Sequence, residues 1–371
     1  MSAPERTTSG RRQAFGRGFH QRSPLVLVAA ALLLALTLLG AELIARDGFV
    51  TRVSEGRFVR YRNDDSGNLG YQMALLKKSP PSGSVVYLLG GSATMESFLD
   101  AGSLSADVSI DARRPVTVIS MAGHAETLGG SLTIVDNLPR TGGLIAVGLS
   151  PGRFTASPQD DSSLLVGYPY LVPSPPMRAA LAGTSARLSP ADVLFPGFVK
   201  YAVTYLEQRV RVRLTPFIDI GYSKHYTIDG PLYSVAQKLH WAQGDVTQDA
   251  SLYAQNADYN FAVLKDLVLL ARQRGFSVVF FDQPINPDII GPTWHGLVPL
   301  YRKRAAALAA QLDVPYLRVG QVVHLQNSDF LDDYHLVVRG RLKWQPVLSR
   351  ELAQNLPAGQ STSYPSVGAA P

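Results

Sequence analysis

The chain has 371 residues, of which 46% are hydrophobic and 17% charged, so it is not a wholly disordered protein. Its net charge of +6 comes mainly from residues 1–24, which carry five arginines against one glutamate, and the remaining chain is nearly neutral. A nearly neutral body lacks the basic footprint of a nucleic-acid-binding protein, and the absence of cysteine excludes disulfides, thiol nucleophiles and thiolate metal sites.

A long apolar segment follows the basic N-terminus. Residues 25–41 carry no charge, and with their flanks they approach the ~20 residues that cross ~30 Å of hydrocarbon. A cleaved signal peptide is the alternative, but its apolar region is usually only ~7–15 residues long and ends in a small-x-small site that this segment lacks. We therefore predict an uncleaved transmembrane helix over residues 24–45.

The position of the basic residues predicts the orientation of this helix. They precede the apolar segment, so the positive-inside rule keeps residues 1–23 in the cytoplasm as a basic tail. The chain after residue 46 is then exported, and its body is expected to be periplasmic or extracellular. Residues 46–83 are polar and irregular, and we expect them to form a stalk leading into the folded domain.

Short apolar runs alternate with helical patterns through the body of the chain. The expected strands cover residues 84–89, 116–121, 144–150, 277–282 and 314–319, and the expected helices cover residues 128–137, 261–274 and 300–312. Continuously apolar strands that alternate with helices indicate a parallel sheet covered on both faces. The fold class is therefore α/β, a doubly wound parallel sheet in three layers, over residues 84–356.

One connection in this pattern is unusually long. Residues 153–256 separate the third and fourth strands, and because they are proline-rich and too many for a loop we expect an inserted subdomain or lid. Within it, residues 193–214 are apolar and aromatic with a basic end; a helix packed on the core is favoured over one that lies on the membrane or docks a partner. Residues 357–371 are rich in proline, glycine and serine and predict a disordered tail.

A serine follows the first expected strand, in the sequence GGSA (90–93). In a parallel α/β sheet ligands bind beyond the carboxyl ends of the strands. Ser92 is placed to act as a nucleophile on a tight turn that opens a helix, where backbone N–H groups could hold an oxyanion. The α/β-hydrolase elbow is not met, because Thr94 occupies its last glycine position. Taken alone, the motif favours turn geometry over a nucleophile, with Ser92 as a helix cap.

An aspartate and a histidine stand near the end of the domain, in the sequence DDYHL (332–336). Serine needs a base to become a nucleophile, and the base needs a carboxylate to orient it; Asp332 and His335 could supply both from one loop. The alternative is a hydrogen-bonded loop histidine without catalytic function. The informative feature is the combination of a serine after the first strand with D-x-x-H before the last helix.

Together these motifs resemble the SGNH (GDSL-like) hydrolase superfamily. The resemblance implies that Ser92 is the nucleophile and first oxyanion donor, and that Gly123 of MAGHAET (121–127) is a second backbone oxyanion donor. It also implies that His335 is the base and Asp332 its partner, with Asp333 as the alternative partner.

The third sequence block of the superfamily is missing. The expected G-x-N-D has no match, because the equivalent strand ends in GLSPGRF (148–154), and Ser150 or Arg153 is left to replace the missing asparagine. Loss of one oxyanion donor can cost ~10²–10³ in rate, so weak hydrolysis or a specialised acyl transfer is expected.

Other residues at the strand ends are candidates for contact with a substrate. For His124 a structural role is favoured, and the prolines around Asn286 are also ordinary turn chemistry. No metal site is predicted, because the histidines lack metal-binding spacing, and no cofactor is expected. The full set of candidate substrate contacts is Arg153, Asn286, His124 and Asp333.

The motifs look most like the membrane-anchored, extracytoplasmic branch of the superfamily, which includes alginate O-acetylation proteins and the accessory protein of teichoic-acid D-alanylation. The resemblance implies a serine-dependent esterase or O-acyltransferase, of O-acetyl groups above all, acting on cell-envelope polysaccharide. The expected ligands are the polysaccharide or an acyl donor, and the expected partner is a multi-span membrane acyltransferase. The alternative is a catalytically weak or inactive module that binds glycan or scaffolds such an acyltransferase.

Overall fold

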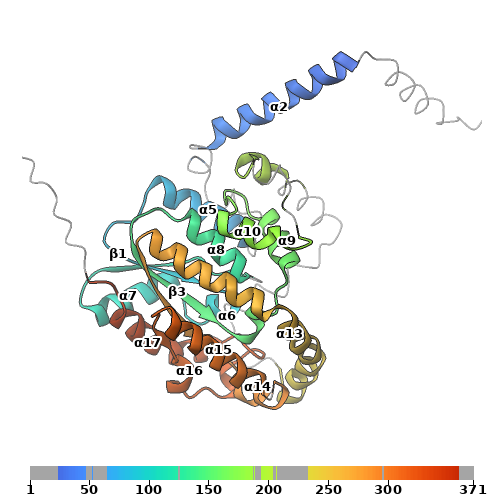
Figure 1. The fold of residues 1–371 in the computed structure, drawn as a ribbon. Helices are drawn as coiled ribbons and strands as arrows, with labels where there is room; N and C mark the ends of the chain where they lie inside the picture. The colour runs from blue at the N-terminus through green and yellow to red at the C-terminus, as the bar shows by residue number, and fades with distance from the viewer. Residues whose placement is uncertain are drawn as a thin grey trace, which may run out of the picture.

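The computed structural model describes residues 24–46, 52, 65–123, 126–186, 188, 194–203, 206, 233–294 and 296–358. Five parallel strands form its central sheet, in the order β2-β1-β3-β4-β5 (Figure 1). The chain order therefore reverses between β1 and β3, and this is the switch point at which doubly wound sheets bind ligands. The strands are β1 (Ser84–Leu89), β2 (Val116–Ser120), β3 (Gly143–Leu149), β4 (Phe276–Asp282) and β5 (Tyr316–Leu317).

The strands form where the apolar runs predicted them, although β5 is only two residues long. The inner strands are buried on both faces, and successive side chains alternate between two hydrophobic clusters. In β1, Tyr87 and Leu89 belong to one cluster, whereas Val86 and Leu88 belong to the other. A continuous apolar run is thus what a strand between two helical layers requires.

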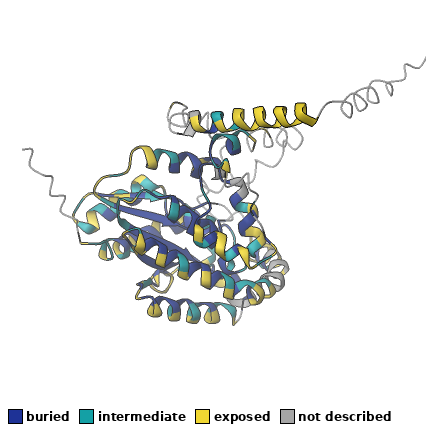
Figure 2. Cartoon of the chain, turned by 45° about the horizontal axis from the view of Figure 1, so that its top comes forward, coloured by how far each residue is buried: buried dark blue, intermediate teal, exposed yellow. Residues whose placement is uncertain are grey.

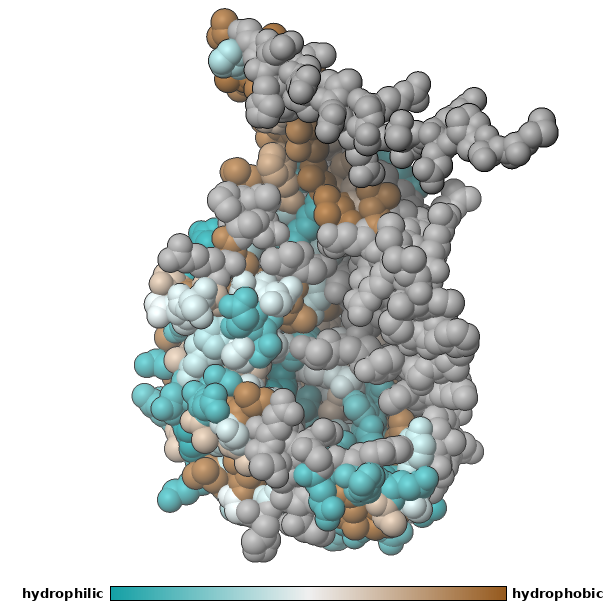
Figure 3. All heavy atoms as spheres, turned by 90° about the vertical axis from the view of Figure 1, so that its right-hand side faces the viewer, coloured by the Kyte–Doolittle hydropathy of each residue, from teal (hydrophilic) through white to brown (hydrophobic). Residues whose placement is uncertain are grey.

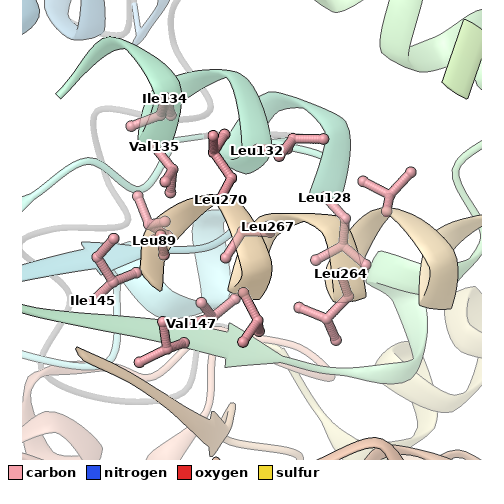
Figure 4. Close-up of a cluster of buried hydrophobic side chains, with 14 of the residues drawn as sticks. Leu89, Leu128, Leu132, Ile134, Val135, Ile145, Val147, Leu264, Leu267 and Leu270 are labelled. Carbon is pink, nitrogen blue, oxygen red and sulfur yellow. The ribbon is translucent and has the colours of Figure 1, made fainter. Parts of the chain in front are cut away.

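Helices cover both faces of the sheet. The larger cluster is closed by α5 (Asp65–Lys78), α8 (Leu128–Asn137), α13 (Val235–Gln273) and α15 (Leu297–Gln311). Figure 4 shows side chains of α8 and α13 meeting Leu89, Ile145 and Val147 of the sheet. The opposite face is covered by α7 (Ala101–Ala112) and α17 (Val338–Gln354), which pack against each other. The predicted three-layer α/β architecture is present.

Helix α13 is much longer than the predicted helix over residues 261–274. It begins at Val235, where Ser234 and Gln237 form a capping box, and so takes up the last part of the expected insertion. Its N-terminal half is mostly polar, although Ala242 and Tyr253 are buried, and it lies within the region that the sequence predicted as an insertion. A 39-residue helix still forms because its C-terminal half packs along the sheet.

The first part of the 153–256 connection packs on the core. It contains η1 (Pro151–Phe154), α9 (Pro158–Gly167) and α10 (Pro175–Ala182), and the last two lie against α8. Leu165, Met177 and Leu181 belong to the larger hydrophobic cluster. Residues 207–232 lie outside the described residues, so the inserted subdomain stays a prediction.

A separate helix, α2 (Pro24–Arg46), precedes the body and reproduces the predicted span (Figure 1). It is long and apolar enough to cross a membrane, and nearly all of its length is exposed (Figure 2). The predicted basic tail (1–23), much of the stalk and residues 359–371 of the predicted disordered tail lie outside the described residues. Helix α5 begins within the region predicted as a stalk.

Leu264 tests the packing between α13 and the sheet, because its side chain is fully buried in the cluster of Figure 4. We expect Leu264→Ala to lower the free energy of unfolding by about 2–5 kcal/mol, through lost burial and a residual cavity. Leu269 on the same helix is exposed, and Leu269→Ala is the control with a change below about 0.5 kcal/mol. Urea unfolding followed by circular dichroism measures both; equal effects would contradict the packing.

Candidate active site

The turn between β1 and the short helix α6 (Ser92–Met95) places Ser92 at the carboxyl edge of the sheet. Gly90 has a φ of +156°, and a Cβ added there would lie 2.1 Å from Thr94 Oγ1. A Cβ on Gly148 in β3 would meet the same oxygen at 2.1 Å. The buried Thr94 side chain therefore fills the space between the two strands, and Gln283 Nε2 donates a hydrogen bond to it at 2.5 Å. Thr94 and Gln283 have a positioning role that the sequence did not indicate.

A continuous chain of hydrogen bonds joins three of the predicted residues. His335 Nε2 lies 2.7 Å from Ser92 Oγ, and His335 Nδ1 lies 2.7 Å from Asp332 Oδ2. The second carboxylate oxygen of Asp332 accepts the N–H groups of Tyr334 at 3.0 Å and His335 at 2.9 Å. The structure thus brings Ser92, His335 and Asp332 together, and it pairs the imidazole with Asp332 rather than Asp333.

The charges of Asp332 and His335 alter each other's pKa. Burial raises the pKa of Asp332, but the charge of His335 and its hydrogen bonds outweigh burial and hold that pKa well below its ordinary value. Burial lowers the pKa of His335, but the charge and hydrogen bond of Asp332, with smaller contributions from Glu96 and Asp333, raise it to about 9. The imidazole can act as a base only after it loses this strongly held proton.

Asn286 supports the loop that carries the triad. Its side chain donates to the Asp332 carbonyl at 2.9 Å and to Asn327 Oδ1 at 3.0 Å, and its N–H donates to the Asp333 carbonyl at 2.8 Å. The buried Lys238 ammonium of α13 donates to the Phe330 carbonyl in the same loop. Because Asn286 is fully buried and its amide is used internally, the structure gives it a positioning role in place of the expected substrate contact.

The expected oxyanion donors differ in their surroundings. The Ser92 N–H is the first of α6, where a helix offers no carbonyl acceptor. The Gly123 N–H donates to the Gly90 carbonyl at 3.1 Å, so it joins the loop after β2 to the end of β1 instead of lying free for a substrate. Ser150 is buried beside β3 and lines the same cavity as Ser92 and His335. His124 lies outside the described residues.

A buried arginine and glutamate, Arg153 and Glu126, lie together at the wall of the site's cavity. The Arg153 guanidinium donates to the carbonyls of Gly148 at 2.9 Å and Thr127 at 2.8 Å, and it lies 3.6 Å from Glu126 Oε1. Ser131 Oγ accepts from Arg153 and donates to Glu126. Arg153 thus holds the end of β3 to the start of α8 through its terminal nitrogens. It also lines the cavity that contains Ser92, so the expected substrate contact stays a prediction. Burial raises the pKa of Glu126 to about 8, against the charge of Arg153.

A cavity of about 640 Å³ opens over Ser92. One wall is formed by the triad loop with Tyr334, and another by Asp160, Ser163 and Leu164 of α9. Its size is that of a pocket for a small organic ligand or a sugar residue. Within the described part of the chain, no three histidine or carboxylate side chains gather into a possible metal site.

Comparison with known protein families finds no family model that matches the chain, and comparison with curated proteins finds no match either. The assignment of a function therefore depends on the geometry of this site.

The raised pKa of His335 predicts a pH profile for the reactivity of Ser92. Because His335 must be neutral to accept the serine proton, we expect the rate of fluorophosphonate labelling to rise with pH through about 9. Asp333→Asn removes only a small cause of the raised pKa and should move the midpoint slightly downward. A midpoint near 6.5 in the wild type would contradict the coupling of His335 to Asp332.

The buried Glu126 predicts a pH dependence of stability. Its pKa in the folded protein is about 8, above the 4.5 of an exposed glutamate, so the folded state binds more protons between these values. Its contribution to stability is complete below about pH 4.5 and declines as pH rises toward 8. Glu126→Gln removes this titration, so the variant's melting temperature should improve relative to the wild type from pH 5 to pH 8. If the difference in melting temperature between Glu126→Gln and the wild type stayed constant from pH 5 to pH 8, the raised pKa of Glu126 would be contradicted.

Proposed function

We propose that this protein is a serine-dependent esterase or O-acyltransferase of the SGNH type. The observation that carries the proposal is the unbroken Ser92–His335–Asp332 hydrogen-bond chain, with both links at 2.7 Å. A nucleophile, a base within reach of its proton and a carboxylate that orients the base form the set that acyl transfer through serine requires.

The position of the Ser92–His335–Asp332 hydrogen bonds at the edge of the sheet supports the proposal. Ser92 follows β1 and Ser150 follows β3, and these strands flank the switch point of the 2-1-3-4-5 order. A cavity opens at the same edge and is lined by Ser92 and His335. A hydrogen-bonded triad buried elsewhere would have no route to a substrate.

The geometry leads to a two-step reaction. Ser92 Oγ attacks the acyl carbonyl while His335 Nε2 takes its proton, and the Ser92 N–H faces the developing oxyanion. His335 then gives the proton to the leaving oxygen, and an acyl ester remains on Ser92. Water or a sugar hydroxyl attacks this ester while His335 accepts its proton, and His335 then returns that proton to Ser92 Oγ as the C–O bond to the acyl group breaks.

The substrate class follows from the sequence resemblance. It implies O-acyl esters, above all O-acetyl esters, of a cell-envelope polysaccharide, acted on beside a multi-span membrane acyltransferase. Helix α2 would then be the single-pass anchor, with the basic N-terminus in the cytoplasm and the catalytic domain outside. Internal use of the Gly123 N–H leaves few oxyanion donors, which favours weak hydrolysis or acyl transfer over rapid hydrolysis.

The same observation supports a second candidate. With the Gly123 N–H bonded to Gly90 and the third sequence block missing, the domain could bind glycan or scaffold an acyltransferase without performing chemistry. The two candidates differ in whether the cell needs Ser92.

Ser92→Ala tests the proposed reaction. We expect it to abolish fluorophosphonate labelling and to lower turnover of acetyl esters by at least ~10³-fold, since the triad loses its nucleophile. Ser163→Ala is the matched control, because Ser163 lines the same cavity but belongs to α9 rather than to the triad. Labelling and ester cleavage by the purified full chain are the measurements.

Two results would distinguish the candidates. Full activity in Ser92→Ala, or no labelling of the wild type at any pH, would overturn the enzyme proposal. An unchanged envelope acetylation phenotype in cells that carry both Ser92→Ala and His335→Ala would favour the non-catalytic module.

A further inference from the structure

Glu42 joins the apolar helix α2 to the body of the protein. Its side chain is only 6% exposed although it belongs to the last turns of a helix that is otherwise open to its surroundings. One carboxylate oxygen accepts the Gly197 N–H at 2.6 Å, and the other accepts the Val199 N–H at 2.9 Å. These N–H groups lie at the start of the helical turn over residues 198–203, where a carboxylate satisfies free donors and meets the positive end of the backbone dipoles.

Residues 194–203, here called the clamp segment, are also fixed to the body. The Pro196 carbonyl accepts the Tyr170 N–H, and the Tyr201 ring packs with Tyr170 in a small buried cluster. The buried Lys200 ammonium donates to the Leu165 carbonyl of α9. Through this segment hydrogen bonds link α2 to the domain, with Glu42 bonded to Gly197 and Val199 and Lys200 bonded to Leu165.

Several apolar side chains in and next to the clamp segment are exposed. Leu194 is 65% exposed, Val203 51% and Leu206 64%, although leucine and valine gain free energy from burial. Leu39 and Leu43 of α2 are also exposed near Glu42. Figure 3 shows apolar side chains gathered at the junction between α2 and the body. Of the region expected as a core helix over residues 193–214, residues 198–203 are helical, with Lys200 and Tyr201 buried against the body and Val203 exposed.

We propose that residues 194–203 and Leu206 lie on the outer surface of the lipid bilayer, and that Glu42 holds the clamp segment at a fixed height against α2. The occupant of this apolar surface is lipid because it continues the lipid-facing surface of α2, whose apolar span ends at Leu43. The inference rests on α2 crossing the membrane, as stated in the proposed function, but it does not depend on the esterase chemistry.

The clamp segment also fixes where the candidate active site opens. Its Lys200 bonds Leu165, and the preceding residues of α9, Ser163 and Leu164, line the cavity above Ser92. The cavity rim is therefore held close to the membrane surface. Substrates presented there, namely lipid-linked or newly exported polymers, reach Ser92 more readily than polymers far from the membrane.

The absence of cysteine allows a direct test of this docking in the intact chain. Leu206→Cys and Leu342→Cys each receive a nitroxide spin label, and the full chain is placed in phosphatidylethanolamine–phosphatidylglycerol vesicles. Leu342 is the matched control, because it is 57% exposed on α17, away from α2 (Figure 1). We expect the label at 206 to be relaxed mainly by oxygen, which dissolves in lipid, and the label at 342 by a water-soluble nickel chelate. Equal exposure of both labels to the chelate would overturn the docking.

Glu42→Ala tests the clamp. It removes both acceptors of the Gly197 and Val199 N–H groups, so the label at 206 should lose its preference for oxygen and become more mobile. Leu43→Ala, on the same turn of α2, should leave the label unchanged. An unchanged signal in Glu42→Ala would overturn the role of Glu42. Release of the wild-type chain from vesicles by alkaline carbonate would instead show that α2 does not anchor the protein in the membrane. Loss of Ser92 reactivity would contradict the esterase proposal and would leave both spin-label results unchanged.

Discussion

The Thr94 side chain fills the space between β1 and β3 at the point where the chain leaves the sheet and enters α6. No Cβ fits at Gly90 or Gly148 beside it, and Gln283 at the end of β4 holds its hydroxyl. The ends of β1, β3 and β4 therefore meet at the Thr94 side chain, and this packing fixes the turn that presents Ser92. The hydrogen bond to His335 requires this accuracy, because a displacement of ~1 Å would separate Ser92 Oγ from the imidazole.

Two acid–base pairs lie near this turn, one partly buried and one fully buried, and the pKa of the acid shifts in opposite directions in the two. In Asp332 and His335 the charges favour each other strongly, so the ionised forms of both are stabilised. In Glu126 and Arg153 the separation is 3.6 Å and burial dominates, so the glutamate holds its proton toward pH 8. In the first pair Asp332 orients the imidazole that can accept the Ser92 proton, whereas the second pair fastens β3 to the loop before α8. The candidate site thus combines a pair that orients the base with a pair that fixes the strand end beside it.

Local patterns in the sequence predicted the fold well, and long-range contacts were the part they could not supply. Apolar runs located the strands, but the N-terminal half of α13 is mostly polar and lies in the stretch that was expected to be an insertion. The motifs around Ser92 and His335 predicted which side chains meet. Nothing near Asn286, Glu126 or Thr94 indicated their partners, because those partners lie on other strands and loops. The internal use of the Gly123 N–H is likewise invisible without the position of Gly90.

The triad joins residues 243 positions apart, with Ser92 after the first strand and His335 after the last. If α2 leads the chain across the membrane, Ser92 emerges early and its base emerges near the end of synthesis. A chain that stops before the D-x-x-H loop could assemble most of its sheet and would still have an unactivated serine. The order of the elements along the chain therefore delays formation of the Ser92–His335 hydrogen bond until the D-x-x-H loop has been synthesised and folded.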